Sequence, residues 1–169
     1  SRIKALISLD AIRYNFEQMK KNIKEGTKII AVIKADAYGH GAVPIARMLE
    51  EFDYIWGFAA ATAQEALQLR KAGITRPILI LGLVFEEYYK KLAENDVRMA
   101  VCDYETARKF NKAAEAAGKK GLIHLAADTG MTRIGFKDSE ESLEEIRRIA
   151  ALPNVEIEGL FTHFARADE

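Results

Sequence analysis

The stretch Lys28-Ile29-Ile30-Ala31-Val32-Ile33-Lys34 (KIIAVIK) decides the fold of this chain. It is rich in β-branched residues, and it is too short and too uniformly apolar for a surface helix. It fits a strand that is buried on both faces, which is typical of parallel sheets covered by helices. The stretch therefore predicts an α/β protein built on a parallel sheet.

The alternation of short apolar runs with amphipathic stretches continues along the chain. Thr62 and Glu65 have the spacing of a capping box, and Gly73 ends the helix that they begin. Asp103 is expected to cap a helix that Gly118 closes. The expected strands are residues 28–34, 54–58, 78–81, 99–101, 122–127 and 156–161, and the expected helices are 10–24, 41–51, 62–72, 86–95, 103–117 and 138–151, the last opened by Asp138.

Repeats of this kind with short connections indicate a parallel sheet, either a doubly wound open sheet or a closed barrel. An open sheet that binds a dinucleotide usually carries a Gly-rich turn after its first strand, and Gly39-His40-Gly41 lacks the third glycine. We therefore expect a partial (β/α)8 TIM barrel with about six βα units. The first and sixth strands would then be unpaired parallel edges, so the chain is either a fragment or needs a partner to supply the remainder.

Length and composition bound the possible functions. The 169 residues suffice for one domain, expected to span 1–169 as an incomplete barrel. Basic and acidic residues number 25 each, which gives no electrostatic footprint for nucleic acid or an anionic membrane. No apolar run approaches the ~20 residues of a membrane span. Cys102 is the single cysteine, expected to be a buried packing thiol, so no internal disulfide forms and a cytoplasmic location is expected.

Catalytic groups of a (β/α)8 barrel lie at the C-terminal ends of its strands. The polar residues predicted there are Lys34, Asp128 and His163, and Arg133 follows in the loop after the fifth strand. A desolvated amine at the end of an apolar run is a good nucleophile toward an aldehyde. Lys34 can equally be a strand-end lysine whose amine reaches solvent.

The neighbouring residues also have two interpretations. Tyr38 could hydrogen-bond an anion at the mouth of the barrel, or belong to an ordinary loop bracketed by glycines. Arg133 could offer its planar guanidinium to a carboxylate or a phenolate, or be a surface arginine. His163 could carry a proton, although a structural imidazole is favoured. Interior or packing positions are expected for Trp56, His124 and Met131.

Three separated segments resemble the signatures of alanine racemases. The segment Ala31–Gly41 (AVIKADAYGHG) looks like their attachment motif for pyridoxal 5'-phosphate (PLP). The segments His124–Gly135 (HLAADTGMTRIG) and Gly159–Ala165 (GLFTHFA) resemble a second and a third signature. The stretches Leu9–Ile12 (LDAI) and Gly57–Ala66 (GFAAATAQEA) fit as well, so the resemblance spans essentially the whole chain.

The resemblance implies an alanine racemase-like PLP fold, in which the barrel is followed by a β-rich C-terminal domain in a head-to-tail homodimer. Lys34 would carry the cofactor covalently and serve as one of two acid–base groups. Tyr38 would contact the cofactor phosphate, and Arg133 would face the cofactor phenolate and the substrate carboxylate. His163 would support the contact to the cofactor ring. No metal ion is implied.

The implied reaction interconverts L-alanine and D-alanine and supplies D-alanine for peptidoglycan. Its second base is a tyrosine of the other subunit, and no segment of this chain corresponds to it. The later barrel strands, with the main phosphate loop, are also missing, so the isolated chain is expected to be a weak or inactive enzyme. Many relatives carry a lysine at the position of Ala126, so that another residue or a small anion would have to hold Arg133.

Three alternatives stay open. The first is a PLP-binding or PLP-carrying barrel protein without racemase activity. The second is an inactive truncated fragment. The third is a serine racemase of the same family, because the residues that discriminate against a small hydroxyl lie largely outside this chain.

Overall fold

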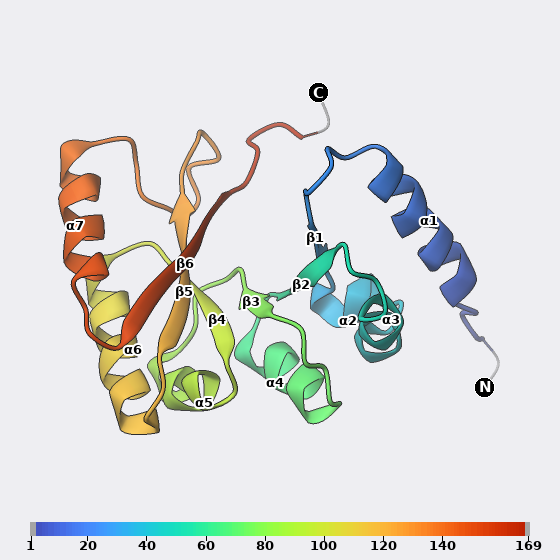
Figure 1. Cartoon of the computed structure of the whole chain (residues 1–169), viewed down its shortest axis with the longest axis horizontal. Helices are drawn as coiled ribbons and strands as arrows, with labels where there is room; N and C mark the ends of the chain where they lie inside the picture. The colour runs from blue at the N-terminus through green and yellow to red at the C-terminus, as the bar shows by residue number, and fades with distance from the viewer. Residues whose placement is uncertain (1–2, 168–169) are drawn as a thin grey trace.

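A computed structural model describes residues 3–167 of the chain (Figure 1). In this part of the chain, six parallel strands form one sheet in the order β1-β2-β3-β4-β5-β6. Each strand therefore pairs with the next one in sequence, as in a (β/α)8 barrel. The strands are β1 (Ile29–Val32), β2 (Ile55–Ala60), β3 (Ile78–Ile80), β4 (Val97–Val101), β5 (Gly121–Ala127) and β6 (Val155–Thr162).

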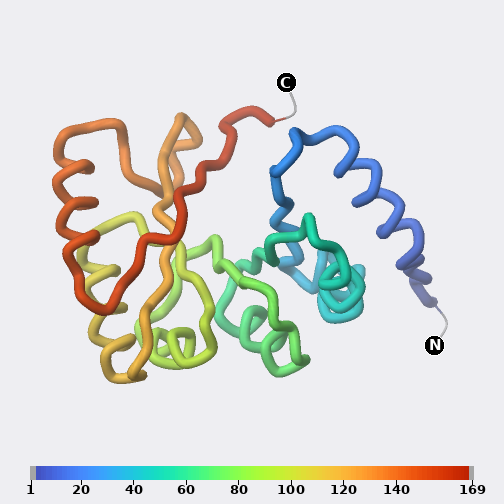
Figure 2. The backbone as a smooth tube through the Cα atoms, viewed as in Figure 1, coloured from blue at the N-terminus to red at the C-terminus, as the bar shows by residue number. Residues whose placement is uncertain are grey.

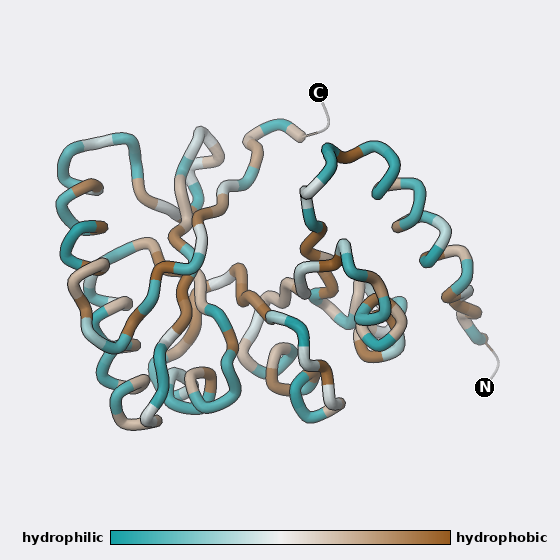
Figure 3. Tube along the Cα trace, viewed as in Figure 1, coloured by the Kyte–Doolittle hydropathy of each residue, from teal (hydrophilic) through white to brown (hydrophobic). Residues whose placement is uncertain are grey.

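The helices lie on the outer side of this curled sheet, and the trace winds steadily from one strand to the next (Figures 1 and 2). Hydrophobic residues concentrate on the strands and on the sides of the helices that face them (Figure 3). No helix within residues 3–167 is long and apolar enough to cross a membrane. The helices are α1 (Leu9–Lys21), α2 (Lys34–Tyr38), α3 (Ala42–Leu49), α4 (Ala63–Lys71), the short 3-10 turn η1 (Glu86–Tyr88), α5 (Tyr89–Glu94), α6 (Tyr104–Ala117) and α7 (Glu140–Ala150).

Local capping signals fix where several helices begin. The Thr62 hydroxyl accepts a hydrogen bond from Glu65 N at 3.2 Å, which confirms the capping box. Asp103 caps α6, and Gly118 ends it with a φ of 63°. The predicted start of the last helix at Asp138 is wrong by one residue. Ser139 is the cap instead, because its hydroxyl accepts from Ser142 N at 3.2 Å.

Other predicted bounds shift by a few residues. The strand predicted to end at Phe58 continues to Ala60, so the end of β2 that faces the site lies two residues later. The helix predicted to reach Lys24 ends at Lys21, where the N–H of Asn22 donates back to the Met19 carbonyl.

The edge strands have the exposure of an open barrel. β1 and β6 each have one neighbour in the described sheet, as predicted. In β1, Ala31 is buried against the helices, whereas Ile30 and Val32 are 37% and 43% exposed on the inner face. The prediction that this strand is buried on both faces is therefore wrong. The interior of a closed barrel is filled by side chains from all its strands, whereas within residues 3–167 β1 has a neighbouring strand on one side only, and Ile30 and Val32 line an open cavity.

A polar cluster crosses the inner face of the sheet below the strand ends. The Glu158 carboxylate on β6 accepts hydrogen bonds from Arg98 on β4, at 2.8 and 2.9 Å, and from His124 on β5, at 2.9 Å. Trp56 packs beside this group, its ring centroid 5.5 Å from that of His124. The hydrogen bonds from Arg98 are the main reason that the pKa of Glu158 lies below its usual range. His124 is thus the satisfied interior histidine that the sequence predicts.

Candidate active site

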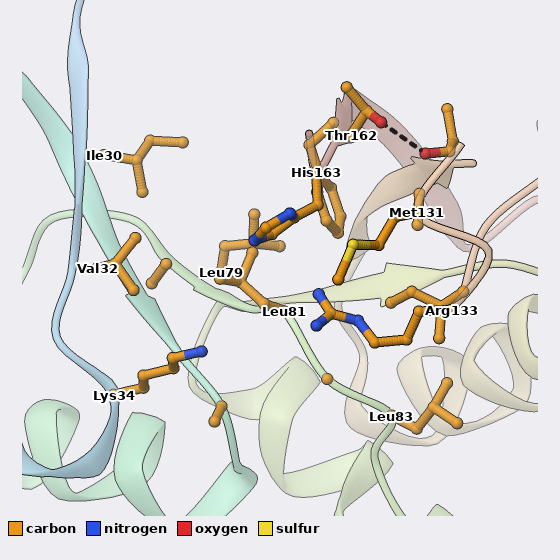
Figure 4. A pocket seen from close by; sticks show the side chains of 17 residues that line it. Ile30, Val32, Lys34, Leu79, Leu81, Leu83, Met131, Arg133, Thr162 and His163 are labelled. Carbon is orange, nitrogen blue, oxygen red and sulfur yellow. Dashed lines mark hydrogen bonds between the residues drawn. The ribbon is translucent and has the colours of Figure 1, made fainter. Parts of the chain in front are cut away.

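A cavity of about 490 Å³ opens at the C-terminal ends of the strands (Figure 4). Its walls are mostly apolar, and three ionisable side chains reach it, those of Lys34, Arg133 and His163. These three residues come from the ends of β1, β5 and β6, so the fold unites segments that are far apart in the sequence. The remaining lining residues are Ile30, Val32, Ala59, Ala61, Leu79, Leu81, Gly82, Leu83, Ala126, Ala127, Met131, Ile134, Phe161 and Thr162.

Lys34 lies two residues after the end of β1 and is the first residue of α2. It is only partly buried, so the structure encloses it less than the apolar run before it suggested. In Figure 4 the amine points into the cavity, toward the side that carries Arg133 and His163. The residue before it is fixed by the sheet, because Ile33 N donates to the Ala59 carbonyl at 2.9 Å.

The segment after Lys34 is a left-handed helical turn that the sequence did not predict. Residues 35–38 have φ values between 50° and 55°, although none of them is glycine. Such a conformation costs about 1–2 kcal/mol per residue. It therefore requires support from surrounding groups.

Two side chains of the same segment supply part of that support. The Asp36 carboxylate accepts a hydrogen bond from Ala42 N at 2.7 Å, which joins the turn to the start of α3. His40 Nδ1 lies 3.0 Å from the Ala37 carbonyl. Because a carbonyl only accepts, this nitrogen carries the proton and donates it to the turn.

The turn sets the position of Tyr38. Its ring centroid lies 6.0 Å from the Lys34 amine, within the range of a cation–π interaction. The tyrosine is 60% exposed and is not among the residues that line the cavity. Tyr38 is thus an exposed neighbour of Lys34 that the structure does not bring into the cavity lining.

The loop after β5 is organised by Asp128. Its carboxylate accepts hydrogen bonds from Thr132 N at 2.9 Å and Gly130 N at 3.0 Å, and these bonds hold its pKa below the usual range. Gly135 closes the loop with a φ of 124°, and a Cβ there would lie 2.6 Å from Asp128 N. Asp128 is thus a loop-forming residue, not a member of the cavity lining.

This loop brings Arg133 to the cavity, where its guanidinium points inward (Figure 4). Within residues 3–167 the side chain forms neither a hydrogen bond nor an ion pair, so it is available to an anion. Ala126 lines the same cavity and is 2% exposed, but it offers no polar group to hold the arginine.

The loops after β5 and β6 are joined by a hydroxyl chain. The Thr162 hydroxyl donates to the Ala127 carbonyl at 2.9 Å (Figure 4). The hydroxyl of Thr129 lies 2.7 Å from that of Thr162 and therefore donates to it. His163 follows, and its Nδ1 donates to the Phe164 carbonyl at 2.8 Å. That bond leaves Nε2 of a neutral ring as an acceptor.

Some site residues were missed or misjudged from the sequence. Met131 was predicted to be a packing residue, but it lines the cavity. Cys102 is half-buried instead of buried, its Sγ lies 3.8 Å from the Asp103 carboxylate, and burial raises the pKa of its thiol. Such a thiol is a poor nucleophile. No group of three or more metal-ligating side chains occurs in the described part of the chain.

Known proteins resemble this chain in sequence and in fold. The family described as "Alanine racemase, N-terminal domain" matches residues 7–169. The alanine racemase of Methanococcus maripaludis is 43% identical over 164 residues, which cover 97% of this chain and 44% of the relative. That of Clostridium kluyveri is 46% identical over 164 residues, covering 96% of this chain and 41% of the relative.

Solved structures give the same result. The alanine racemase of Clostridium difficile 630 superposes with a TM-score of 0.93 at 45% identity, covering 96% of this chain and 43% of that one. A histidine racemase from Leuconostoc mesenteroides gives a TM-score of 0.84 at 31% identity, covering 94% and 42%. The chain thus spans less than half the length of these relatives. The family match, the identities and the shared fold show that this chain belongs to the alanine racemase family, in the part described as its N-terminal domain.

Proposed function

We propose that the chain is the N-terminal, PLP-binding part of an enzyme that interconverts L-alanine and D-alanine. One observation carries the proposal: the Lys34 amine and the Arg133 guanidinium line the same cavity at the ends of the strands. Relatives described as alanine racemases, at 41–46% identity, support alanine as the substrate. The likeness to a histidine racemase is weaker, at 31% identity.

The cavity fits PLP. It provides one amine for the aldehyde, apolar walls for an aromatic ring, and for an anionic oxygen the guanidinium of Arg133, which has no partner within residues 3–167. Ile30, Val32 and Leu81 are among the apolar side chains that line the cavity together with Lys34 (Figure 4). When bound, PLP supplies delocalisation of the negative charge that develops at the substrate α-carbon.

Each of the four predicted residues has a role in this proposal. Lys34 would hold the cofactor, and its amine would take or return the α-proton on one face. Arg133 would hold the substrate carboxylate and the cofactor phenolate with charge-assisted hydrogen bonds. The Tyr38 hydroxyl would contact the cofactor phosphate, and His163 would support the cofactor ring.

Inversion at the α-carbon requires a second acid–base group on the opposite face. Apart from Lys34, the ionisable groups that line the cavity within residues 3–167 are Arg133 and His163. We assign the second group to a tyrosine of another subunit in a homodimer of the full-length protein. The isolated chain is accordingly a weak or inactive racemase. A cytoplasmic location and a supply of D-alanine for peptidoglycan complete the proposal.

A labelling experiment tests the cofactor assignment. The chain is incubated with PLP and reduced with borohydride, and the modified lysine is mapped by mass spectrometry. Label concentrated on Lys34 is the expected result, and label scattered over surface lysines would remove the assignment.

A second assay then measures conversion of L-alanine to D-alanine. Little or no turnover is expected from the isolated chain, and turnover is expected from a chimera in which this chain replaces the matching N-terminal residues of a full-length relative. Efficient turnover by the 169-residue chain alone would contradict the assignment of the second base to another subunit.

A further inference from the structure

Glu65 on α4 contacts the segment that carries Lys34. Its Oε1 accepts a hydrogen bond from Ala35 N at 2.8 Å, and Ala35 directly follows the lysine. Its Oε2 accepts from Ala61 N at 2.8 Å and from Thr62 N at 3.3 Å. One carboxylate therefore ties the end of β1, the end of β2 and the start of α4 together.

These contacts exceed what a helix cap needs. In a capping box the glutamate carboxylate accepts one hydrogen bond, from the N–H of the N-cap residue, here Thr62, and that bond is the longest of the three. The two shorter bonds go to Ala61 and Ala35, outside the helix. Capping of α4 accounts for the bond from Thr62 to Glu65. It does not account for the bond from Ala35, which has no role in α4.

That bond lies where the backbone most needs support. Ala35 is the first of the four non-glycine residues with positive φ, and this turn directs both Lys34 and Tyr38. Two carboxylates hold the turn from different helices. The Asp36 carboxylate accepts from the first amide of α3, whereas the Glu65 carboxylate on α4 accepts from the amide of Ala35, the first residue of the turn. Without the carboxylate, the Ala35 amide would turn toward water and the lysine would follow it.

We propose that Glu65 is a positioning residue for Lys34, which fixes the left-handed turn so that the amine faces the cavity. The proposal rests on the proposed function, because it concerns the reactivity of Lys34 toward PLP. Glu65 acts through the backbone of residue 35 and does not line the cavity.

The first test compares Glu65→Gln with Thr62→Ala in the full chain. A glutamine has a single acceptor oxygen, so its amide group would face either the Ala35 or the Ala61 N–H. We expect the share of pyridoxyl label found on Lys34 to fall about fivefold, which corresponds to one net hydrogen bond of about 1 kcal/mol. Thr62→Ala removes the capping hydroxyl and leaves the carboxylate contacts, so it should lower stability without changing that share.

A second variant, Glu65→Asp, keeps the proposal testable if Glu65→Gln does not fold. Aspartate keeps a negative charge in the first turn of α4, but it is one methylene too short to reach both Ala35 and the cap. It should therefore lose selectivity for Lys34 while circular dichroism stays that of the parent chain. A label distribution equal to that of the parent in both Glu65 variants would overturn the proposal. Absence of label on Lys34 in the parent chain would instead refute the proposed function.

Discussion

Removal of the Glu158 carboxylate tests how much the cluster of Arg98, His124 and Glu158 on the inner face of the sheet stabilises the fold. The carboxylate binds Arg98 through two parallel hydrogen bonds, at 2.8 and 2.9 Å, and His124 through a third, at 2.9 Å. The side chains of Arg98 and Glu158 are only 12% and 25% exposed. Glu158→Ala would leave the largely buried guanidinium of Arg98 without its carboxylate partner.

The expected loss follows from the burial. Breaking a fully buried ion pair by removing one partner costs about 3–5 kcal/mol. The partial exposure of Glu158 lowers this figure, so we expect Glu158→Ala to reduce the free energy of unfolding by about 2–3 kcal/mol. For a chain of this size the corresponding fall in Tm is about 4–12 °C.

The loss should depend on pH in a defined direction. The pKa of Glu158 lies below its ordinary value of 4.5 in the folded chain. Its charged form therefore contributes stability that is fully present above about pH 4.5 and is lost as the pH falls through the lower, folded-state value. The difference between parent and variant should be constant near neutral pH and shrink in more acidic solution.

Urea unfolding followed by circular dichroism measures this difference at several pH values. Glu156→Ala is the matched control, because Glu156 lies on the same strand, is exposed, and forms no ion pair within residues 3–167. Equal unfolding midpoints for the Glu158 and Glu156 variants at neutral pH would refute the reasoning. So would a difference that grows as the pH is lowered.

Three other substitutions test the packing and the site. Gly135→Ala should cost about 1–3 kcal/mol, because its Cβ would lie 2.6 Å from Asp128 N at a φ of 124°, and an unchanged urea midpoint would contradict this. Phe110→Ala, at a side chain with 0% exposure, should cost about 3–5 kcal/mol in the same assay, and a loss below that of a surface residue would show that the core is misplaced. Arg133→Gln should weaken PLP binding about tenfold or more in an absorbance titration while leaving the midpoint unchanged, and unaltered affinity would remove Arg133 from the site.

The helix boundaries that the sequence predicted correctly depend on local chemistry. The capping box at Thr62 and the cap at Asp103 each join residues three positions apart. A short segment of sequence is therefore enough to recognise these helix starts. The gathering of Lys34, Arg133 and His163 was predictable for a different reason. Parallel strands with short connections bring their C-terminal ends to one side.

The features that sequence analysis missed depend on distant contacts. The left-handed turn at residues 35–38 has no local signal, because alanine and tyrosine normally avoid positive φ and aspartate adopts it only occasionally, as a single residue. Its supports include Glu65, thirty residues further along the chain. The exposure of Val32 likewise depends on what lies opposite the sheet, which an apolar run cannot reveal.

A crystal structure of the chain grown with PLP tests the central claim most directly. The account predicts electron density that continues from the Lys34 nitrogen into the cofactor, with the ring inside the cavity and Arg133 beside its phenolate oxygen. Density for the cofactor on a different lysine, or a Lys34 side chain directed into bulk solvent, would contradict it.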